Sequence, residues 1–362
     1  MNGNPGLPAS GPGLQPATDL LQSQSPDNST TKISPDKASK FSQFKSGFSG
    51  LPGKISGHFQ SLSKQPVNRV PTLIPSSPKA YSVAKPPPSD IGQKIQLAVD
   101  AELAAYPYHR SFANVADAVK SAEGIDDTVL SLGSWDTARP LALSAGKAAK
   151  LSTKGADGFI FDEKSGLTAY VLHNPKSDPP EVRLVFGGTT SGKKTGGLTK
   201  RSALNGAFTL KQWVANAKNA AFGKTPDSYK QAKELASKVQ NMMAVDPTYK
   251  DFTLTISGHS KGGGEAAYAA LSLKEPVQAI CFSSAELGRT MHKSFSEEQK
   301  ANASRYITHY NIEGDPVPNV SKALGGLGHL GKVVTLPSDG SGSNPLDRHD
   351  KFNRHICHYA NS

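Results

Sequence analysis

Hydrophobic residues between positions 158 and 311 gather into short runs that predict β-strands. The runs are "GFIFDE" (158–163), "LTAYVLH" (167–173), "VRLVFGG" (182–188), "FTLTIS" (252–257), "VQAICF" (277–282) and "RYITHYN" (305–311). Runs of this length, rich in Val, Ile, Leu and Phe, are typical of strands. Lys164-Ser165-Gly166 separates the first two runs. This spacing predicts a hairpin between them.

Other segments repeat their apolar residues at helical spacing. Residues 209–220, 227–244 and 261–273 predict helices, and we interpret the apolar face of 227–244 as core packing. Ser89-Asp90 predicts the start of an earlier helix, and residues 112–119 predict a short one after it. Strands that alternate with helices favour an α/β fold with a mostly parallel central sheet and helices on both faces.

The first 90 residues differ in composition from the rest of the chain. They contain 14 of the 26 prolines, nine Lys or Arg and four Asp, and their sparse apolar residues show no period. Such a segment buries too little apolar surface to offset its conformational entropy. We therefore expect residues 1–89 to form a disordered leader and residues 90–362 to form one folded domain.

Charge and residue usage exclude several functional classes. The net charge of +11 favours anionic partners such as lipid headgroups, but no basic stripe is interleaved with aromatic residues, so nucleic-acid binding is not expected. Two cysteines give no disulfide framework, and we expect both to be buried free thiols. No cluster of His and Cys has metal-ligand spacing, so we expect no metal and no cofactor. No apolar run approaches the length of a membrane span, and the first residues lack the features of a Sec signal.

The segment "LTISGHSKGGGEAAYAALSL" (254–273) contains a Gly-x-Ser-x-Gly motif centred on Ser260. A predicted strand runs directly into the motif and a predicted helix leaves it. In that context Gly258 and Gly262 allow strand and helix to approach closely around a strained turn, which exposes the serine hydroxyl at a helix N-terminus. We interpret Ser260 as a nucleophile; the alternative is a serine that only caps the helix.

A serine hydroxyl needs a base to take its proton, and the base needs an acid to orient it. Asp315 in "NIEGDPVPNV" follows the predicted strand 305–311, so it should lie at the same sheet edge as Ser260, with Glu313 as the rival acid. In this architecture the base follows the acid in the chain. The segment "RHDKFNRHICHYANS" (348–362) offers His355, which we favour, then His349 and finally His358.

The oxyanion formed by nucleophilic attack requires preorganised N–H donors. One expected donor is the backbone amide of Lys261, the residue after the nucleophile. The second donor is expected from the segment "LVFGGTTSG" (184–192), which follows an earlier strand. Gly187-Gly188 would let backbone amides point inward, and Thr189 can add its N–H and hydroxyl; the alternative is a plain glycine turn.

Three motifs, "ISGHSKGG", "VFGGT" and "NIEGDPVP", together resemble the class 3 lipase family of the α/β-hydrolases, and the Ser-Lys-Gly-Gly variant is similar to its bacterial Mbeg1-like members. The resemblance covers roughly residues 155–362. It implies an α/β-hydrolase fold with Ser260 as nucleophile, Asp315 as acid and Thr189 as oxyanion residue. The family's base often stands in a His-x-x-x-Tyr-like ending, which His355 and Tyr359 match. Gly187 stands where the family usually has arginine.

The leader is similar in composition to the Ser/Pro-rich, acid-poor leaders of type III secreted effectors, and a lipase domain behind such a leader resembles bacterial lipase effectors. This resemblance implies secretion into a host cell, a chaperone on the leader and peripheral contact with an anionic membrane. The predicted function is that of a serine esterase acting on phospholipid or other acyl-lipid substrate, phospholipase A1-like. The alternative is a module that binds phosphoinositide or a host protein with little turnover.

In class 3 lipases the lid follows the oxyanion motif. The corresponding segment here, residues 191–208, carries Lys193, Lys194, Lys200 and Arg201 among glycines. We hypothesise that this cationic lid selects anionic headgroups; the alternative is an ordinary solvated loop.

Replacing these four cations by glutamate should therefore weaken hydrolysis of anionic vesicles more than that of zwitterionic ones, because the attraction to anionic headgroups becomes repulsion. Release of fatty acid from vesicles of graded anionic-lipid content measures this. An unchanged lipid preference would contradict the lid hypothesis.

Overall fold

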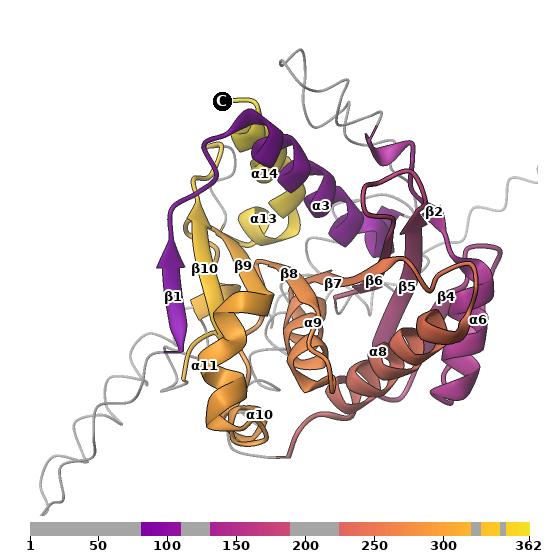
Figure 1. The fold of residues 1–362 in the computed structure, drawn as a ribbon. Coiled ribbons are helices and arrows are strands. Elements are labelled where there is room, and N and C mark those ends of the chain that lie inside the picture. Colours follow the sequence, from indigo (N-terminus) through magenta and orange to yellow (C-terminus); the bar gives the residue numbers. More distant parts are fainter. Residues whose placement is uncertain (1–80, 110–130, 189–223, 320–326, 341–344) are drawn as a thin grey trace, which may run out of the picture. The chain divides into compact units, whose positions relative to one another are not determined.

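The computed structural model describes residues 81–109, 131–188, 224–319, 327–340 and 345–362. These residues build a ten-stranded sheet with helices on both faces (Figure 1). The strands run in the spatial order β1-β10-β9-β8-β7-β6-β5-β4-β3, and β2 pairs with β5 beside this path. Along this path the pairs from β1 to β6 are parallel, whereas β5, β4 and β3 add as antiparallel neighbours.

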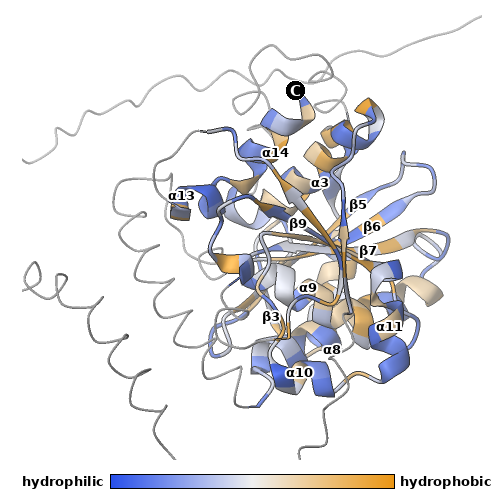
Figure 2. Ribbon diagram, turned by 90° about the vertical axis from the view of Figure 1, so that its left-hand side faces the viewer, coloured by the Kyte–Doolittle hydropathy of each residue, from blue (hydrophilic) through white to orange (hydrophobic). Residues whose placement is uncertain are grey.

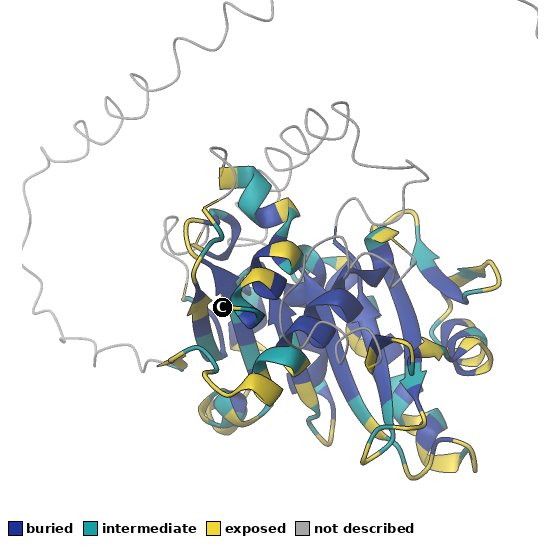
Figure 3. Ribbon diagram, turned by 90° about the horizontal axis from the view of Figure 1, so that it is seen from above, coloured by how far each residue is buried: buried dark blue, intermediate teal, exposed yellow. Residues whose placement is uncertain are grey.

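The strand bounds are β1 (Ser82–Lys85), β2 (Asp136–Thr137), β3 (Ser152–Lys154), β4 (Phe159–Asp162), β5 (Leu167–Asn174), β6 (Glu181–Phe186), β7 (Thr253–His259), β8 (Gln278–Phe282), β9 (Ile307–Ile312) and β10 (Gly331–Leu336). The central strands β6 and β7 are almost wholly buried along their second halves, while exposed residues gather on the outer helices and hairpins (Figure 3). Burial on both faces explains why small, apolar or internally paired residues fill the second halves of these strands.

The described helices are α3 (Ile91–His109), α6 (Arg139–Ala148), α8 (Asp227–Val245), α9 (Lys261–Ser272), α10 (Arg289–Lys293), α11 (Glu297–Tyr306), α13 (Pro345–Asp350) and α14 (Phe352–Ala360), with a 3-10 turn at Val317–Asn319. Residues of α6, α8 and α9 share one apolar cluster with the sheet. Residues of α3 and α14 pack on the opposite face in two further clusters. The outward faces of α8 and α10 are mostly hydrophilic, as an amphipathic surface helix requires (Figure 2).

The predicted α/β-hydrolase fold is confirmed, including the hairpin between β4 and β5. Strand β1 lies before residue 90, where we expected the folded domain to begin. Its backbone pairs with β10, so it is part of the sheet. Strand β9 begins at Ile307 rather than at 305, because a helix with a capping box at Ser296 continues to Tyr306. The helices expected at 112–119 and 209–220, like most of the leader, lie outside the described residues.

The cysteines and the lengths of the described helices agree with what we expected from the sequence. Both cysteines, Cys281 and Cys357, are buried free thiols. None of the described helices is long and apolar enough to cross a membrane.

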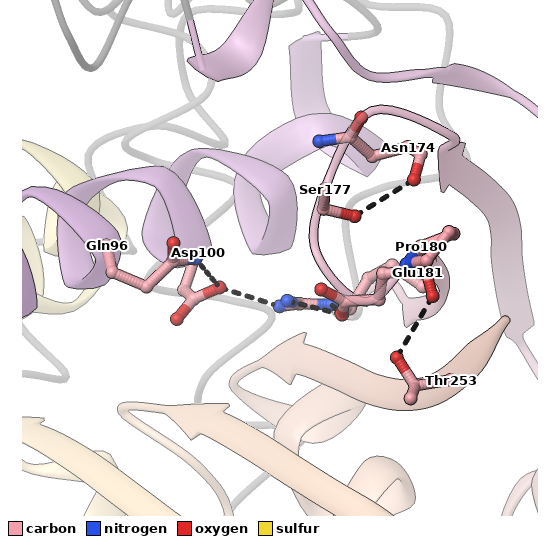
Figure 4. A network of polar contacts seen from close by, with 8 residues as sticks. Gln96, Asp100, Asn174, Ser177, Pro180, Glu181 and Thr253 are labelled. Atoms are coloured by element: carbon pink, nitrogen blue, oxygen red, sulfur yellow. Dashed lines mark hydrogen bonds and ion pairs between the residues drawn. The ribbon is translucent and has the colours of Figure 1, made fainter.

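A buried arginine fastens α3 to the sheet (Figure 4). Arg183 of β6 is only 2% exposed, and its Nη1 lies 2.9 Å from Oδ1 of Asp100 on α3. The Nη2 of the same guanidinium lies 2.7 Å from Glu181, and its Cζ lies 5.5 Å from the centre of the Trp135 ring. Gln96 donates a further hydrogen bond to Asp100. The charges are thus paired and hydrogen-bonded, as buried charges must be.

Arg183→Met should lower the free energy of unfolding by roughly 3–5 kcal/mol, because it leaves two acidic groups without their cation. The matched control is Lys238→Met, which breaks the exposed pair of Lys238 with Glu234 and should cost less than about 1 kcal/mol. Urea denaturation measures both. Equal losses in the two variants would contradict a stabilising role for the buried network.

Candidate active site

Ser260 occupies a strained turn between β7 and α9. Its φ of 60° and ψ of −126° are unusual for a residue with a side chain, and that side chain makes no capping hydrogen bond to the helix. The backbone is held on both sides: the Ser260 N–H donates to Phe282 O at 3.0 Å, and the Ser260 carbonyl accepts from the Ala285 N–H at 2.9 Å. This strand–turn–helix geometry matches the nucleophile elbow that the motif predicted, and the residue remains partly exposed.

Two glycines make this turn possible. A Cβ on Gly262 would collide with the backbone carbonyl of Phe186 on β6, and a Cβ on Gly258 would collide with the carbonyl of Gly262. Helix α9 therefore begins in backbone contact with two neighbouring strands. Only residues without side chains allow an approach this close.

The side chain of Lys261 is tied back into the domain. Its Nζ lies 2.6 Å from Oε1 of Glu265, one helical turn later, and donates to Gly166 O in the β4–β5 hairpin at 3.1 Å. Glu265 is completely buried, and this burial raises the pKa of its carboxyl although Lys261 opposes the shift. The Lys261 amide, at the first position of α9, has no acceptor within the helix. This amide is the expected first oxyanion donor.

Asp315 lies just beyond β9 and is 2% exposed. Its Oδ1 accepts from the Val317 N–H at 2.9 Å, and its Oδ2 lies 2.9 Å from Nδ1 of His349. The preceding residue, Gly314, has a φ of 77°, and a Cβ there would collide with the guanidinium of Arg348. The Arg348 side chain of α13 thus packs against this glycine, and the next residue, His349, lies beside the carboxylate.

His355, the base that the sequence favoured, does not contact Asp315. It lies on α14, is fully buried, and its Nδ1 is 2.9 Å from Oδ1 of Asp339, a residue beyond β10. Burial lowers the pKa of His355 although Asp339 opposes the shift. Of the three C-terminal histidines, the structure thus brings His349 to Asp315, while His358 is exposed. The expected pairing is corrected from His355 to His349.

His259, the residue before Ser260, links the turn to this carboxylate–imidazole pair. The ring of His259 stacks on Phe352 with centroids 4.0 Å apart and lies 4.4 Å from the ring of His349. His259 is 3% exposed, and burial lowers the pKa of its imidazole well below the ordinary value. His259 is therefore neutral at physiological pH, and it places His349 close to the turn that carries Ser260.

The loop after β6 has two glycine amides with partners inside the domain. The Gly187 N–H donates to Thr168 O at 2.9 Å, and the Gly188 N–H donates to the hydroxyl of Tyr108 at 3.0 Å. Because both amides are already bonded, the next amide in the chain, that of Thr189, stays the expected second oxyanion donor. Thr189 itself lies outside the described residues.

A family model described as a Tle-like phospholipase domain matches residues 135–335, more than half of the 362-residue chain. The chain belongs to the Tle-like phospholipase family. The expected lipase-type hydrolase is thereby confirmed at the level of the family, whereas the Mbeg1-like subgroup and the effector role stay predictions. Among curated proteins, none has a sequence that matches this Tle-like chain.

Solved lipase structures are similar to the Tle-like chain at low identity. The propeptide complex of Rhizomucor miehei lipase has a TM-score of 0.40 and 14% identity, covering 74% of this chain and 78% of its own. Lipase II from Rhizopus niveus has a TM-score of 0.38 and 16% identity, covering 66% and 78%. Nonglycosylated LIP2 lipase from Yarrowia lipolytica has a TM-score of 0.37 and 12% identity, covering 67% and 78%.

Reasoning from the sequence of this Tle-like domain missed several contacts in and around the candidate site. Tyr108 and Asp339 carry no motif that would reveal their contacts. The pair of Lys261 and Glu265 was visible as an i,i+4 spacing of opposite charges. The proposed lid cations Lys193, Lys194, Lys200 and Arg201 lie outside the described residues. Among the described ones, no group of acidic, His or Cys side chains could hold a metal ion.

Gly262→Ala should destabilise the Tle-like domain by more than about 3 kcal/mol or prevent its folding, because the new methyl group meets backbone that cannot move aside. The matched control is Gly92→Ala on α3, where a Cβ would approach only the exposed Asp90 carboxylate, which accepts from the Gln93 N–H. This variant should change stability by less than about 1 kcal/mol. Thermal unfolding of both variants measures the difference. If Gly262→Ala has the same Tm as Gly92→Ala, the close approach of α9 to β6 does not constrain the fold.

Proposed function

We propose that this Tle-like domain is a serine esterase that hydrolyses acyl-lipid esters, with Ser260 as nucleophile, His349 as base and Asp315 as orienting acid. The proposal rests on the contact between Asp315 Oδ2 and His349 Nδ1 at 2.9 Å. The His349 ring lies 4.4 Å, between centroids, from the ring of His259, which is the neighbour of Ser260 in the chain. In a Ser–His–Asp site the acid holds the imidazole through Nδ1, which leaves Nε2 to serve the serine.

In the proposed reaction, the Ser260 Oγ attacks the acyl carbonyl while His349 Nε2 takes the hydroxyl proton. The carbonyl π pair moves to oxygen, and the resulting oxyanion is held by the amides of Lys261 and Thr189. When the tetrahedral intermediate collapses, the C–O bond to the leaving alkoxide breaks, and His349 returns its proton to that alkoxide. Water then repeats the sequence on the acyl-enzyme, which releases the fatty acid.

The finer assignment is a phospholipase A1-like activity on phospholipids at an anionic membrane surface. The family match and the net charge of +11 support it. The second candidate, a module that binds phosphoinositide or a host protein with little turnover, is favoured by the same charge. Export through a type III system, with a chaperone on the leader, stays a prediction of leader composition; export of a chain without residues 1–80 would contradict it.

Ser260→Ala and His349→Ala should each reduce lipid hydrolysis at least about 1,000-fold, because each removes an essential group. His355→Ala is the matched control: it deletes a buried imidazole that also pairs with a carboxylate, but one that belongs to Asp339. We expect this variant, once shown to be folded, to keep activity within about tenfold of the wild type. Mass spectrometry of fatty acid and lyso-lipid released from mixed liposomes measures all three.

The outcomes separate the assignments. Loss of activity in His355→Ala but not in His349→Ala would return the base to His355. No release of fatty acid by the wild-type chain, together with vesicle binding that Ser260→Ala leaves unchanged, would favour the binding module. The position of the fatty acid lost from a mixed-chain phospholipid decides between A1-like and other regiospecificity.

A further inference from the structure

Tyr108 lies near the end of α3, and its hydroxyl lies between the loop after β6 and the His259 side chain. The hydroxyl accepts from the Gly188 N–H at 3.0 Å and lies 2.9 Å from Nδ1 of His259. The phenol ring also meets the His259 ring edge-on, with centroids 5.5 Å apart. One side chain thus contacts both the loop that leads to Thr189 and the residue that precedes Ser260.

The Gly188 N–H can only donate, which fixes the direction of that hydrogen bond; the direction of the bond to His259 follows when the imidazole carries its proton on Nε2. A phenol has one proton to give, so the phenol oxygen accepts from Gly188 and can donate its own proton to His259. Burial raises the pKa of Tyr108 and lowers that of His259. The phenol therefore keeps its proton, and the neutral imidazole offers an acceptor lone pair at Nδ1.

The bridge continues from His259 to the proposed base. The His259 ring is held flat against Phe352, at an interplanar angle of 7°, and its other neighbour is the ring of His349. A change in the orientation of His259 would therefore be transmitted to His349 by direct ring contact. The Tyr108 hydroxyl fixes that orientation through Nδ1.

We propose that Tyr108 is a positioning residue that sets the oxyanion loop and the catalytic base together. This inference rests on the proposed esterase function. The phenol takes up the Gly188 amide, which fixes the backbone just before Thr189, and it orients His259, which in turn supports His349. The hydrogen bonds of the Tyr108 hydroxyl go to Gly188 and His259, so Tyr108 acts through these two residues.

The buried ion pair of Arg183 with Asp100 holds α3, which carries Tyr108, against β6. Along α3, Tyr108 lies eight residues after Asp100, a rise of about 12 Å. Along the chain of β6, Gly188 lies five residues after Arg183, about 16 Å in extended conformation. Because Arg183 ties Asp100 to β6, helix and strand reach the site from a shared anchor, and the phenol meets the glycine amide.

The test is Tyr108→Phe, which keeps the ring and removes only the hydroxyl. With a soluble p-nitrophenyl butyrate substrate, we expect kcat to fall roughly 10- to 100-fold while KM changes less than about twofold, since misplaced donors and base act on the transition state. Inactivation by a fluorophosphonate, which develops charge at the same oxyanion position, should slow by a similar factor. The matched control is Tyr249→Phe, a buried phenol in the turn before β7, at the opposite end of that strand from Ser260.

Two variants of His259 test the same hydrogen bond from its acceptor side. They test the positioning role even if Tyr108→Phe does not fold. His259→Asn keeps an acceptor near the Nδ1 position, whereas His259→Leu removes it. We expect His259→Asn to retain at least about fivefold more activity than His259→Leu. Thermal unfolding of every variant shows whether a loss of activity accompanies a loss of stability.

Each outcome decides one of the two proposals. If Tyr108→Phe turns over and reacts with fluorophosphonate like the wild type, or if the two His259 variants lose activity equally, the positioning role is wrong and the esterase proposal stands. If kcat falls only in proportion to the fraction unfolded, Tyr108 is merely structural and the inference is overturned. If the wild-type chain neither hydrolyses esters nor reacts at Ser260, the esterase proposal fails and the role of Tyr108 falls with it.

Discussion

The structure depends on a backbone crossing that leaves no room for side chains. Helix α9 leaves β7 so close to β6 that Gly262 lies against the carbonyl of Phe186, and Gly258 lies against Gly262 itself. This crossing holds Ser260 at a positive φ, and the turn is fastened by hydrogen bonds to β8 and to the loop after it. A strained conformation persists only where its surroundings overdetermine it, and here three strands and a helix do so.

Two cations near the central strands are committed to ion pairs inside the domain. Lys261, although it adjoins Ser260, pairs its charge with buried Glu265 and contacts the β4–β5 hairpin. Arg183 is likewise paired with Asp100 and Glu181. Both cations serve the scaffold, so an anionic lipid surface would have to be met by other cations of this chain, whose net charge is +11.

The C-terminal histidines show how two similar pairs arise from different constraints. His349 and His355 each contact a carboxylate at 2.9 Å through Nδ1, and both are buried. They differ in which loop the partner carboxylate comes from. Asp315 follows β9, next to the central strands that carry the elbow, whereas Asp339 follows β10, one strand farther toward the edge of the sheet. The two pairs also differ locally: the Asp339 N–H lies 3.2 Å from His355 Nδ1, and Arg354 Nε lies 3.3 Å from Oδ2 of Asp339.

Local pattern was enough to predict the strands that build the centre of the sheet, the elbow at Ser260 and the loop of Asp315, because each rests on residues that are neighbours in the chain. It failed for β1, α13 and α14, which are short and owe their conformation to partners far away in sequence. The contact of Asp315 with His349 and that of Asp339 with His355 follow from how α13 and α14 pack on the sheet, and the contacts of Tyr108 follow from how α3 packs on it. The contacts of Tyr108 with Gly188 and of Asp100 with Arg183 join residues 80 and 83 positions apart, so no spacing along the chain encodes them. Only the packed fold decides which of these side chains meet.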